Sequence, residues 1–158
     1  MSIRACNRCS GTTKLGLRCK LRTCKSKLCW LHLKSIHGLR IKKSKITGAF
    51  DGLWTLKDIR NGENIGPYDG ELLSYDPKNN YSLELDKNHF IDGKKTDSSY
   101  TRYINTCKLE NRRRKQCSEN NAAFIVNRHN KTARVKAKQN IKANSEILAS
   151  YGWNYPIY

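Results

Sequence analysis

The pattern of apolar and polar positions predicts a chain built mainly from short strands. Apolar and polar side chains alternate along residues 81–86 and 133–137, and Ala122, Phe124 and Val126 recur at every second position along 122–126. This is the two-residue period of a half-buried strand. Dipeptides typical of tight turns separate such segments, for example Asn61-Gly62 and Asp92-Gly93. No segment keeps a helical period for long. The pattern therefore favours a mainly β domain.

Two segments far apart in the chain share a weak internal similarity. Residues 58–65 and 140–147 have related patterns of Asn, Glu and Ile. We predict that each forms a turn leading into a short apolar strand.

The distribution of charge divides the chain. The 158 residues include no Asp or Glu before Asp51, whereas the same stretch holds 13 Lys and Arg. The remaining 18 Lys and Arg face all 13 Asp and Glu, so this later part carries only +5 of the net charge of +18. Such uncompensated positive charge favours a polyanionic partner, with a solubilising basic arm as the alternative. We predict a module at 1–37, a basic linker at 38–46 and a β-rich domain at 47–158.

Composition limits the class of protein. The mean hydropathy of -0.77 is low, but the apolar residues gather in short runs, which predicts a folded domain rather than disorder. No run reaches the roughly 18 apolar residues of a membrane span, and the first residues lack the apolar core of a signal peptide. Seven cysteines in such a chain favour reduced thiols and metal ligation over disulfides. We therefore expect an intracellular protein.

Six short motifs occur in an order that is known from one enzyme family. They are residues 48–54, 62–63, 68–71, 91–93, 102–105 and 146–152. Together they resemble the SET-domain protein lysine methyltransferases over residues 47–155. The resemblance implies several small sheets around a knot-like chain crossing. It also implies that S-adenosylmethionine binds on one face and that the target lysine enters from the other.

The chemistry of lysine methylation explains why such residues are needed. A lysine amine has a pKa of about 10.4 in water and must lose its proton before it attacks the sulfonium methyl group. A narrow apolar channel lowers that pKa, and a tyrosine hydroxyl can orient the lone pair. The resemblance assigns Tyr151, with Tyr68, to catalysis, and Tyr68, Trp153 and Tyr155 to the channel walls. Ordinary core packing is the alternative for these aromatic residues.

The resemblance also assigns a cofactor site. In the family, the main chain of a glycine-bearing loop meets the methionine part of the cofactor. That loop corresponds here to Ala49, Phe50, Asp51 and Gly52. The family's asparagine motif corresponds to Arg102, Asn105 and Thr106. Phe50 stands where the family usually has glycine, and Thr106 where it usually has histidine. Both departures affect the shape expected of the pocket.

A basic insertion follows the asparagine motif. Residues 108–119 separate Asn105 from the second asparagine of the motif, which we expect at Asn121. The insertion contains four consecutive basic residues, Arg112, Arg113, Arg114 and Lys115. Beside an active site they would bind DNA phosphates or an acidic nucleosome surface, with a solvated loop as the alternative.

Cysteine and histidine residues cluster in the first forty residues, with more candidate ligands than one tetrahedral zinc ion can use. The segment 9–32 resembles small zinc modules of large DNA viruses. This resemblance implies four ligands with two alternates, namely Cys9, Cys19, Cys29 and His32, with Cys6 and Cys24 as substitutes. So few apolar residues lie here that the segment could not fold without metal. We expect a surface position for His37 and assign no role to Cys107 or Cys117.

These features together predict an S-adenosylmethionine-dependent protein lysine N-methyltransferase with a zinc module. We expect it to act on histones or nucleosomes in the nucleus, with DNA contacts from the module and from Arg112, Arg113, Arg114 and Lys115. Compactness and the zinc segment favour a viral origin, in which case the protein would work in the host cell or virion. Two alternatives stay open. One is a nucleic-acid or nucleosome binding protein with a catalytically weak SET-like domain, and the other is an enzyme with a non-histone substrate.

Overall fold

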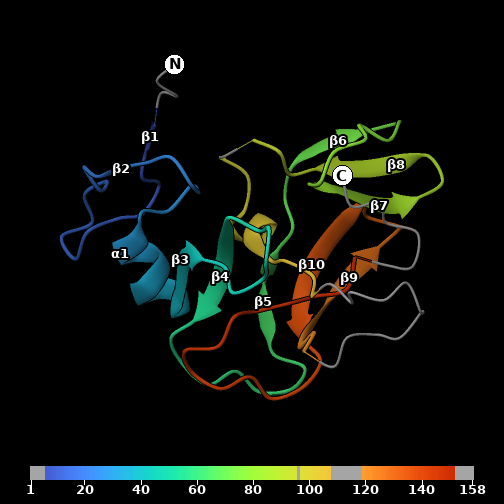
Figure 1. Cartoon of the computed structure of the whole chain (residues 1–158). Coiled ribbons are helices and arrows are strands. Elements are labelled where there is room, and N and C mark those ends of the chain that lie inside the picture. Colours follow the sequence, from blue (N-terminus) through green and yellow to red (C-terminus); the bar gives the residue numbers. More distant parts are fainter. Residues whose placement is uncertain (1–5, 96, 108–118, 152–158) are drawn as a thin grey trace.

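The computed structural model describes residues 6–95, 97–107 and 119–151. Short strands in four small sheets are the main regular structure of the described residues, whose longest helix has five residues (Figure 1). No helix among the described residues is long and apolar enough to cross a membrane. The mainly β fold predicted from the alternating pattern is confirmed.

The N-terminal part forms a small body at the left of Figure 1. Its strands β1 (Asn7–Arg8) and β2 (Arg22–Thr23) pair antiparallel. The short helix α1 (Trp30–His32) continues into a π-helical turn, η1 (Leu33–His37). This turn ends at Gly38, whose φ of 66° lies in the left-handed region that glycine adopts without strain.

The segment expected to be a linker contains a strand. β3 (Leu39–Lys43) pairs antiparallel with β4 (Asp51–Thr55). Leu39 is buried and Ile41 half-buried, so the segment has the period of a strand, but Arg40 and the lysines beside it dominate its composition. The division into 1–37, 38–46 and 47–158 remains a prediction.

Two three-stranded antiparallel sheets form the rest of the domain. One has the order β5 (Asn64–Pro67), β10 (Thr132–Ala137), β9 (Ala122–Asn127). The other has the order β6 (Glu71–Leu73), β8 (His89–Asp92), β7 (Ser82–Asp86). The strands predicted at 81–86, 122–126 and 133–137 are thus confirmed as β7, β9 and β10. A 3-10 helix, η2 (Tyr100–Tyr103), makes contacts with both β4 and β5.

The main core packs residues from the N-terminal part against residues near the end of the described chain. It contains 13 buried residues, from Leu33 and Leu39 to Ile147 and Ala149. The two segments with similar sequences also meet, because Ile59 and Ile141 exchange two backbone hydrogen bonds of 2.8 Å. Sequence similarity therefore marks two turns that pack against each other.

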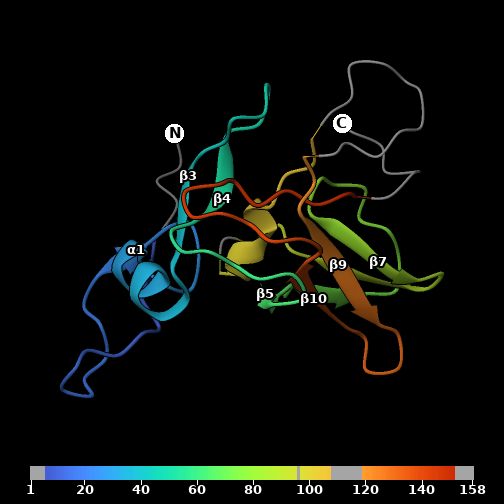
Figure 2. The same ribbon diagram turned by 90° about the horizontal axis from the view of Figure 1, so that it is seen from below.

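The last described segment passes between two earlier parts of the chain. Leu148 forms a parallel bridge with Asn105, and Ala149 forms another with Ala122. The side chain of Asn121 fixes this crossing, since it donates to the Glu146 carbonyl at 2.9 Å and accepts from the Leu148 N–H at 3.0 Å. In Figure 2 the red segment runs from the side of β4 past the yellow η2 helix towards the start of β9. The crossing brings the chain that leads to Tyr151 beside the asparagine motif.

Candidate functional site

The hydroxyl of Tyr151 is fixed beside the asparagine motif. It donates a hydrogen bond of 2.6 Å to the carbonyl of Ile104, the residue that precedes Asn105. Ile104 is 1% exposed, so this carbonyl lies in the interior of the domain. The structure thus brings together two residues, Tyr151 and Asn105, that are far apart in the sequence.

Three aromatic side chains form a row that ends at Tyr151. The ring of Tyr68 meets that of Phe124 edge-on, with centroids 5.4 Å apart, and Phe124 lies 6.3 Å from Tyr151. The Tyr68 hydroxyl donates to the Tyr81 carbonyl at 2.8 Å, which fixes the far end of the row. We call Tyr68, Phe124 and Tyr151 the aromatic row. Trp153 and Tyr155, the other expected channel residues, lie outside the described residues.

Sequence reasoning did not single out Phe124. Its signal was present, because it occupies an apolar position of the predicted strand at 122–126. It is half-buried and packs against both large hydrophobic clusters. Only the sheet order β5-β10-β9 and the chain crossing reveal that Phe124 lies beside both Tyr68 and Tyr151.

The expected cofactor loop lies against Asn105. The loop connects β3 to β4, and the Asn105 side chain donates to the Asp51 carbonyl at 2.9 Å. The Asp51 carboxylate also forms an ion pair of 2.9 Å with Lys25 of the N-terminal part. Phe50 projects into solvent with 92% of its surface exposed, so the loop's main chain, rather than this ring, faces the domain. Ala49 and Thr106 are half-buried, and Gly52 is buried.

Arg102 connects the asparagine motif to the second sheet. Its guanidinium donates to the carbonyls of Gly93 at 2.7 Å and Lys94 at 2.8 Å. It also stacks over the ring of Tyr81 at 4.2 Å and that of Tyr103 at 4.9 Å. Burial raises the pKa of Tyr103, against the opposing effect of the Arg102 charge. These contacts give Arg102 a structural role, and its assignment to the cofactor remains a prediction.

A second site in the N-terminal part has the geometry of a metal centre. The ligand atoms of Cys9, Cys19, Cys29 and His32 all lie within 4.8 Å of one another. The His32 Nδ1 atom is 3.5 Å from the Cys9 sulfur and 3.4 Å from the Cys29 sulfur. A tetrahedral zinc ion bonded at about 2.3 Å to sulfur and about 2.0 Å to nitrogen separates such atoms by about 3.5 Å. The four side chains therefore fit zinc.

Hydrogen bonds and close packing around the four ligand side chains favour metal binding. The Thr12 carbonyl, 2.8 Å from His32 Nε2, can only accept, so Nε2 carries the proton and Nδ1 keeps its lone pair. A Cβ on Gly11 would lie 2.6 Å from the His32 ring, so only glycine allows this approach. Burial raises the pKa of the Cys9 thiol, but hydrogen bonds from the Cys29 and Gly11 N–H groups outweigh it. The result is a pKa lowered from 9.0 to about 7.

The neighbours of His32 also shift its pKa. Its hydrogen bond to the Thr12 carbonyl raises the pKa of His32, and the neighbouring Cys9 contributes in the same direction. A zinc ion bound by the four side chains would supply the positive charge that thiolate ligands require.

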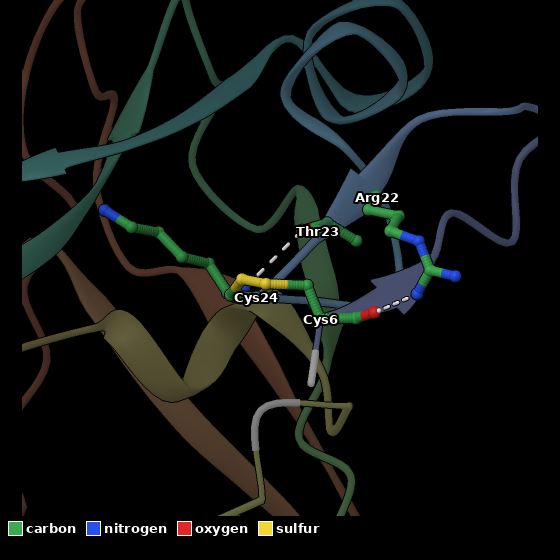
Figure 3. Close-up of a disulfide and its surroundings, with 5 residues drawn as sticks. Cys6, Arg22, Thr23 and Cys24 are labelled. Carbon is green, nitrogen blue, oxygen red and sulfur yellow. Dashed lines mark hydrogen bonds between the residues drawn. A yellow bond between two sulfur atoms is a disulfide. The ribbon is translucent and has the colours of Figure 1, made fainter. Parts of the chain in front are cut away.

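The two alternate ligands form a disulfide in the structure. Cys6 and Cys24 are linked, with Cα atoms 4.4 Å apart (Figure 3). The register of β1 with β2 pairs Asn7 with Thr23, which places Cys6 opposite Cys24. The Arg22 guanidinium also donates to the Cys6 carbonyl at 2.8 Å. The expectation of reduced thiols was thus wrong for this pair and also for Cys107, which is disulfide-bonded.

Comparison with known proteins decides the family of the β domain. The family model described as "SET domain" matches residues 51–152. The chain belongs to the SET-domain family. This is the family of lysine methyltransferases that the six motifs indicated. No curated protein sequence matches the chain.

Solved structures similar to this SET domain include Polycomb complexes of Chaetomium thermophilum. A humanized mutant of Polycomb Repressive Complex 2 bound to an inhibitor is 25% identical over 75% of this chain, with a TM-score of 0.59. The C. thermophilum complex bound to the same inhibitor is 26% identical over 75% of the chain, with a TM-score of 0.59. An autoinhibited form bound to S-adenosylmethionine has a TM-score of 0.60 over 77% of the chain at 24% identity, which shows the fold alone. The chain spans only 15% or 16% of the length of these proteins.

His37 joins the N-terminal part to the SET domain. Its ring packs on Tyr100 with centroids 4.8 Å apart, and its Nδ1 lies 3.4 Å from the Tyr100 hydroxyl. Burial and the charge of Lys57 lower the pKa of His37. The expected surface position was therefore wrong, because the η1 turn directs this side chain towards η2.

Part of the N-terminal positive charge is used within the module. Arg8 donates to the Cys19 carbonyl at 2.8 Å, and Arg18 donates to the Cys9 carbonyl at 3.3 Å. Arg112, Arg113, Arg114 and Lys115 lie outside the described residues. The insertion that contains them starts and ends close together, because the Cys107 N–H donates to the Asn120 side chain at 3.1 Å. DNA contact by these groups remains a prediction.

Proposed function

We propose that this protein is an S-adenosylmethionine-dependent protein lysine N-methyltransferase. The observation that carries the proposal is the hydrogen bond of 2.6 Å that fixes the Tyr151 hydroxyl on the Ile104 carbonyl, directly beside Asn105. Membership of the SET-domain family supports the same reaction. Tyr151 is the proposed catalytic residue.

The described residues include candidates for both the cofactor side and the lysine side of the proposed site. S-adenosylmethionine, when bound, supplies a methyl group on a positively charged sulfur. Asn105 and the main chain at Ala49 to Gly52 would hold it, since the Asn105 side chain already ties the loop at Asp51. On the other side, the aromatic row offers an apolar wall that disfavours a charged lysine.

The direction of the Tyr151 hydrogen bond defines its role. Its hydroxyl donates its proton to the Ile104 carbonyl, so towards an amine N–H the oxygen would act as an acceptor. An amine N–H that donates to this oxygen would have its own lone pair directed elsewhere, towards the methyl group. Tyr151 therefore orients the nucleophile, and the aromatic row helps to keep it neutral.

We propose histones or nucleosomes as the substrate and the nucleus as the place of action. The similar solved structures are Polycomb complexes, which supports a chromatin setting. The first 50 residues, with 13 basic and no acidic side chains, suit a partner that carries phosphates. Zinc held by Cys9, Cys19, Cys29 and His32 would fold the module that carries this charge.

A second candidate is a nucleosome or nucleic-acid binding protein with weak or absent turnover. Phe50, 92% exposed on the cofactor loop, is the observation that favours it, because a large apolar side chain there can change cofactor access. Calorimetry separates the two candidates, since an enzyme must bind S-adenosylmethionine and a binding protein need not.

Transfer of a labelled methyl group from S-adenosylmethionine to histones or nucleosomes tests the proposal. We expect label on lysine side chains, identified after hydrolysis as methyllysine. Cofactor binding with label on non-histone proteins alone would keep the enzyme and exclude the histone substrate. Absence of both binding and transfer would leave the binding protein as the function.

A further inference from the structure

A buried carboxylate lies underneath the proposed cofactor site. Glu146 is 1% exposed and belongs to the segment that passes through the chain crossing. A buried carboxylate is costly unless donors surround it, so its partners indicate what it holds in place.

Glu146 has three hydrogen-bond donors from two distant segments. The Ser44 hydroxyl donates to Oε1 at 2.6 Å, and the Lys45 N–H donates to Oε2 at 2.9 Å. The Asn105 side chain, which donates to the Asp51 carbonyl at 2.9 Å, also approaches Oε1 at 3.4 Å. One carboxylate therefore contacts both the residue and the loop that are proposed to bind the cofactor.

The loop between β3 and β4 is built around this carboxylate. Ser44 also accepts from the Ile46 N–H at 3.0 Å, and its own N–H donates to the Phe50 carbonyl at 3.0 Å. A Cβ on Gly52 would lie 2.1 Å from Glu146 Oε1, so only glycine at this position leaves room for the carboxylate. Residues 44–52 thus take their conformation from contacts with Glu146 at one end and Asn105 at the other.

We propose that Glu146 is the positioning residue of the cofactor site. It holds loop 44–52 and the Asn105 side chain in one arrangement before the cofactor arrives, so that binding does not have to order them. The inference rests on the proposed function, because it names how that same site is organised. The side-chain hydrogen bonds of Glu146 reach Ser44, Lys45 and Asn105 on the proposed cofactor side, so we expect its effect to fall on cofactor binding.

The test is calorimetric binding of S-adenosylmethionine to the full chain and to Glu146→Gln. Glutamine keeps one acceptor oxygen and replaces the other with an NH2 group that cannot accept from the Lys45 N–H. Loss of a hydrogen bond to a charged group predicts roughly tenfold to hundredfold weaker cofactor binding. The KM for a lysine peptide, measured at saturating cofactor, is expected to stay unchanged. Glu63→Gln, the same change at a half-buried carboxylate away from the site, is the matched control and should bind normally.

A double substitution tests whether Glu146 acts through Asn105. Asn105→Ala alone should weaken cofactor binding, and adding Glu146→Gln should weaken it by less than the sum of the two single effects. Fully additive effects would overturn the inference. So would a Glu146→Gln protein that melts at a lower temperature but binds the cofactor as tightly as the unmodified chain.

Two further outcomes keep the inference separate from the proposed function. If the unmodified chain binds no S-adenosylmethionine, the proposed function fails, and the inference fails with it. If Glu146→Gln does not fold, as judged by circular dichroism, Ser44→Ala replaces it, since it removes one donor and leaves the carboxylate. Ser44→Ala is expected to weaken cofactor binding severalfold, and unchanged binding would contradict the role of Glu146.

Discussion

Removing metal from the N-terminal module is expected to unfold that module and leave the SET domain folded. Cys9, Cys19 and Cys29 are at most 5% exposed and form, with half-buried Leu28, a small cluster of their own. The main core is a larger cluster of 13 residues, which Leu28 also contacts. Structural zinc contributes about 10 to 16 kcal/mol in small modules, which far exceeds what so small a cluster supplies.

The expected effect of losing one ligand follows from the same figure. Divided equally among four ligands, this free energy amounts to about 2.5 to 4 kcal/mol each, or a roughly hundredfold to thousandfold loss of zinc affinity. We expect this loss for Cys29→Ser in competition with a coloured chelator. In the unmodified chain, chelation should make Cys9, Cys19 and Cys29 reactive towards a thiol reagent and move tryptic cleavage into the first 37 residues.

The disulfide provides a matched control for these measurements. Replacing Cys6 and Cys24 together by serine removes two sulfurs from the module but none of the four clustered ligands. This protein should keep one zinc ion per chain. Zinc loss in the control, or unchanged affinity in Cys29→Ser, would refute the assigned ligand set.

Three other predictions concern stability and nucleic-acid binding. Gly66→Ala places a Cβ 2.4 Å from the Tyr100 hydroxyl, so it should lower the free energy of unfolding in urea by about 1 to 3 kcal/mol, and an unchanged midpoint would contradict the packing. Because the pKa of His37 is lowered in the folded chain, protonation of His37 favours the unfolded state. The free energy of unfolding should therefore be highest above pH 6.5, the pKa of the unfolded state, and should fall as the pH drops below it. Urea midpoints across this range should show the fall in the unmodified chain and a smaller one in His37→Gln, and equal slopes would contradict the assignment. Affinity for DNA should decrease steeply with salt, and a flat response would mean that the basic N-terminal segment only solubilises.

Local pattern predicted much of the fold. The strands at 81–86, 122–126 and 133–137 could be read from alternation because each buries one face. Strand β3 was missed because its exposed positions are basic, and that composition resembled a linker. A half-buried strand tolerates any polar residue on its solvent-exposed face, so a basic composition does not exclude a strand.

The candidate site depended more on contacts between distant residues. Motif order brought Tyr151 and Asn105 into one hypothesis, yet the contact between their segments exists only because of the chain crossing. Phe124 lies outside the six motifs and Glu146 only begins the last of them, so the roles of both depend on neighbours far away in the sequence. The Cys6–Cys24 pair likewise follows from the register of β1 and β2, which cysteine spacing does not specify.

The most direct test of the central claim compares methyl transfer by the unmodified chain and by Tyr151→Phe. Phenylalanine keeps the ring beside Phe124 and removes only the hydroxyl that contacts the Ile104 carbonyl. We expect cofactor binding to persist and the rate of methyllysine formation at saturating cofactor to fall by roughly a hundredfold or more. A Tyr151→Phe protein that methylates lysine as fast as the unmodified chain would contradict the account.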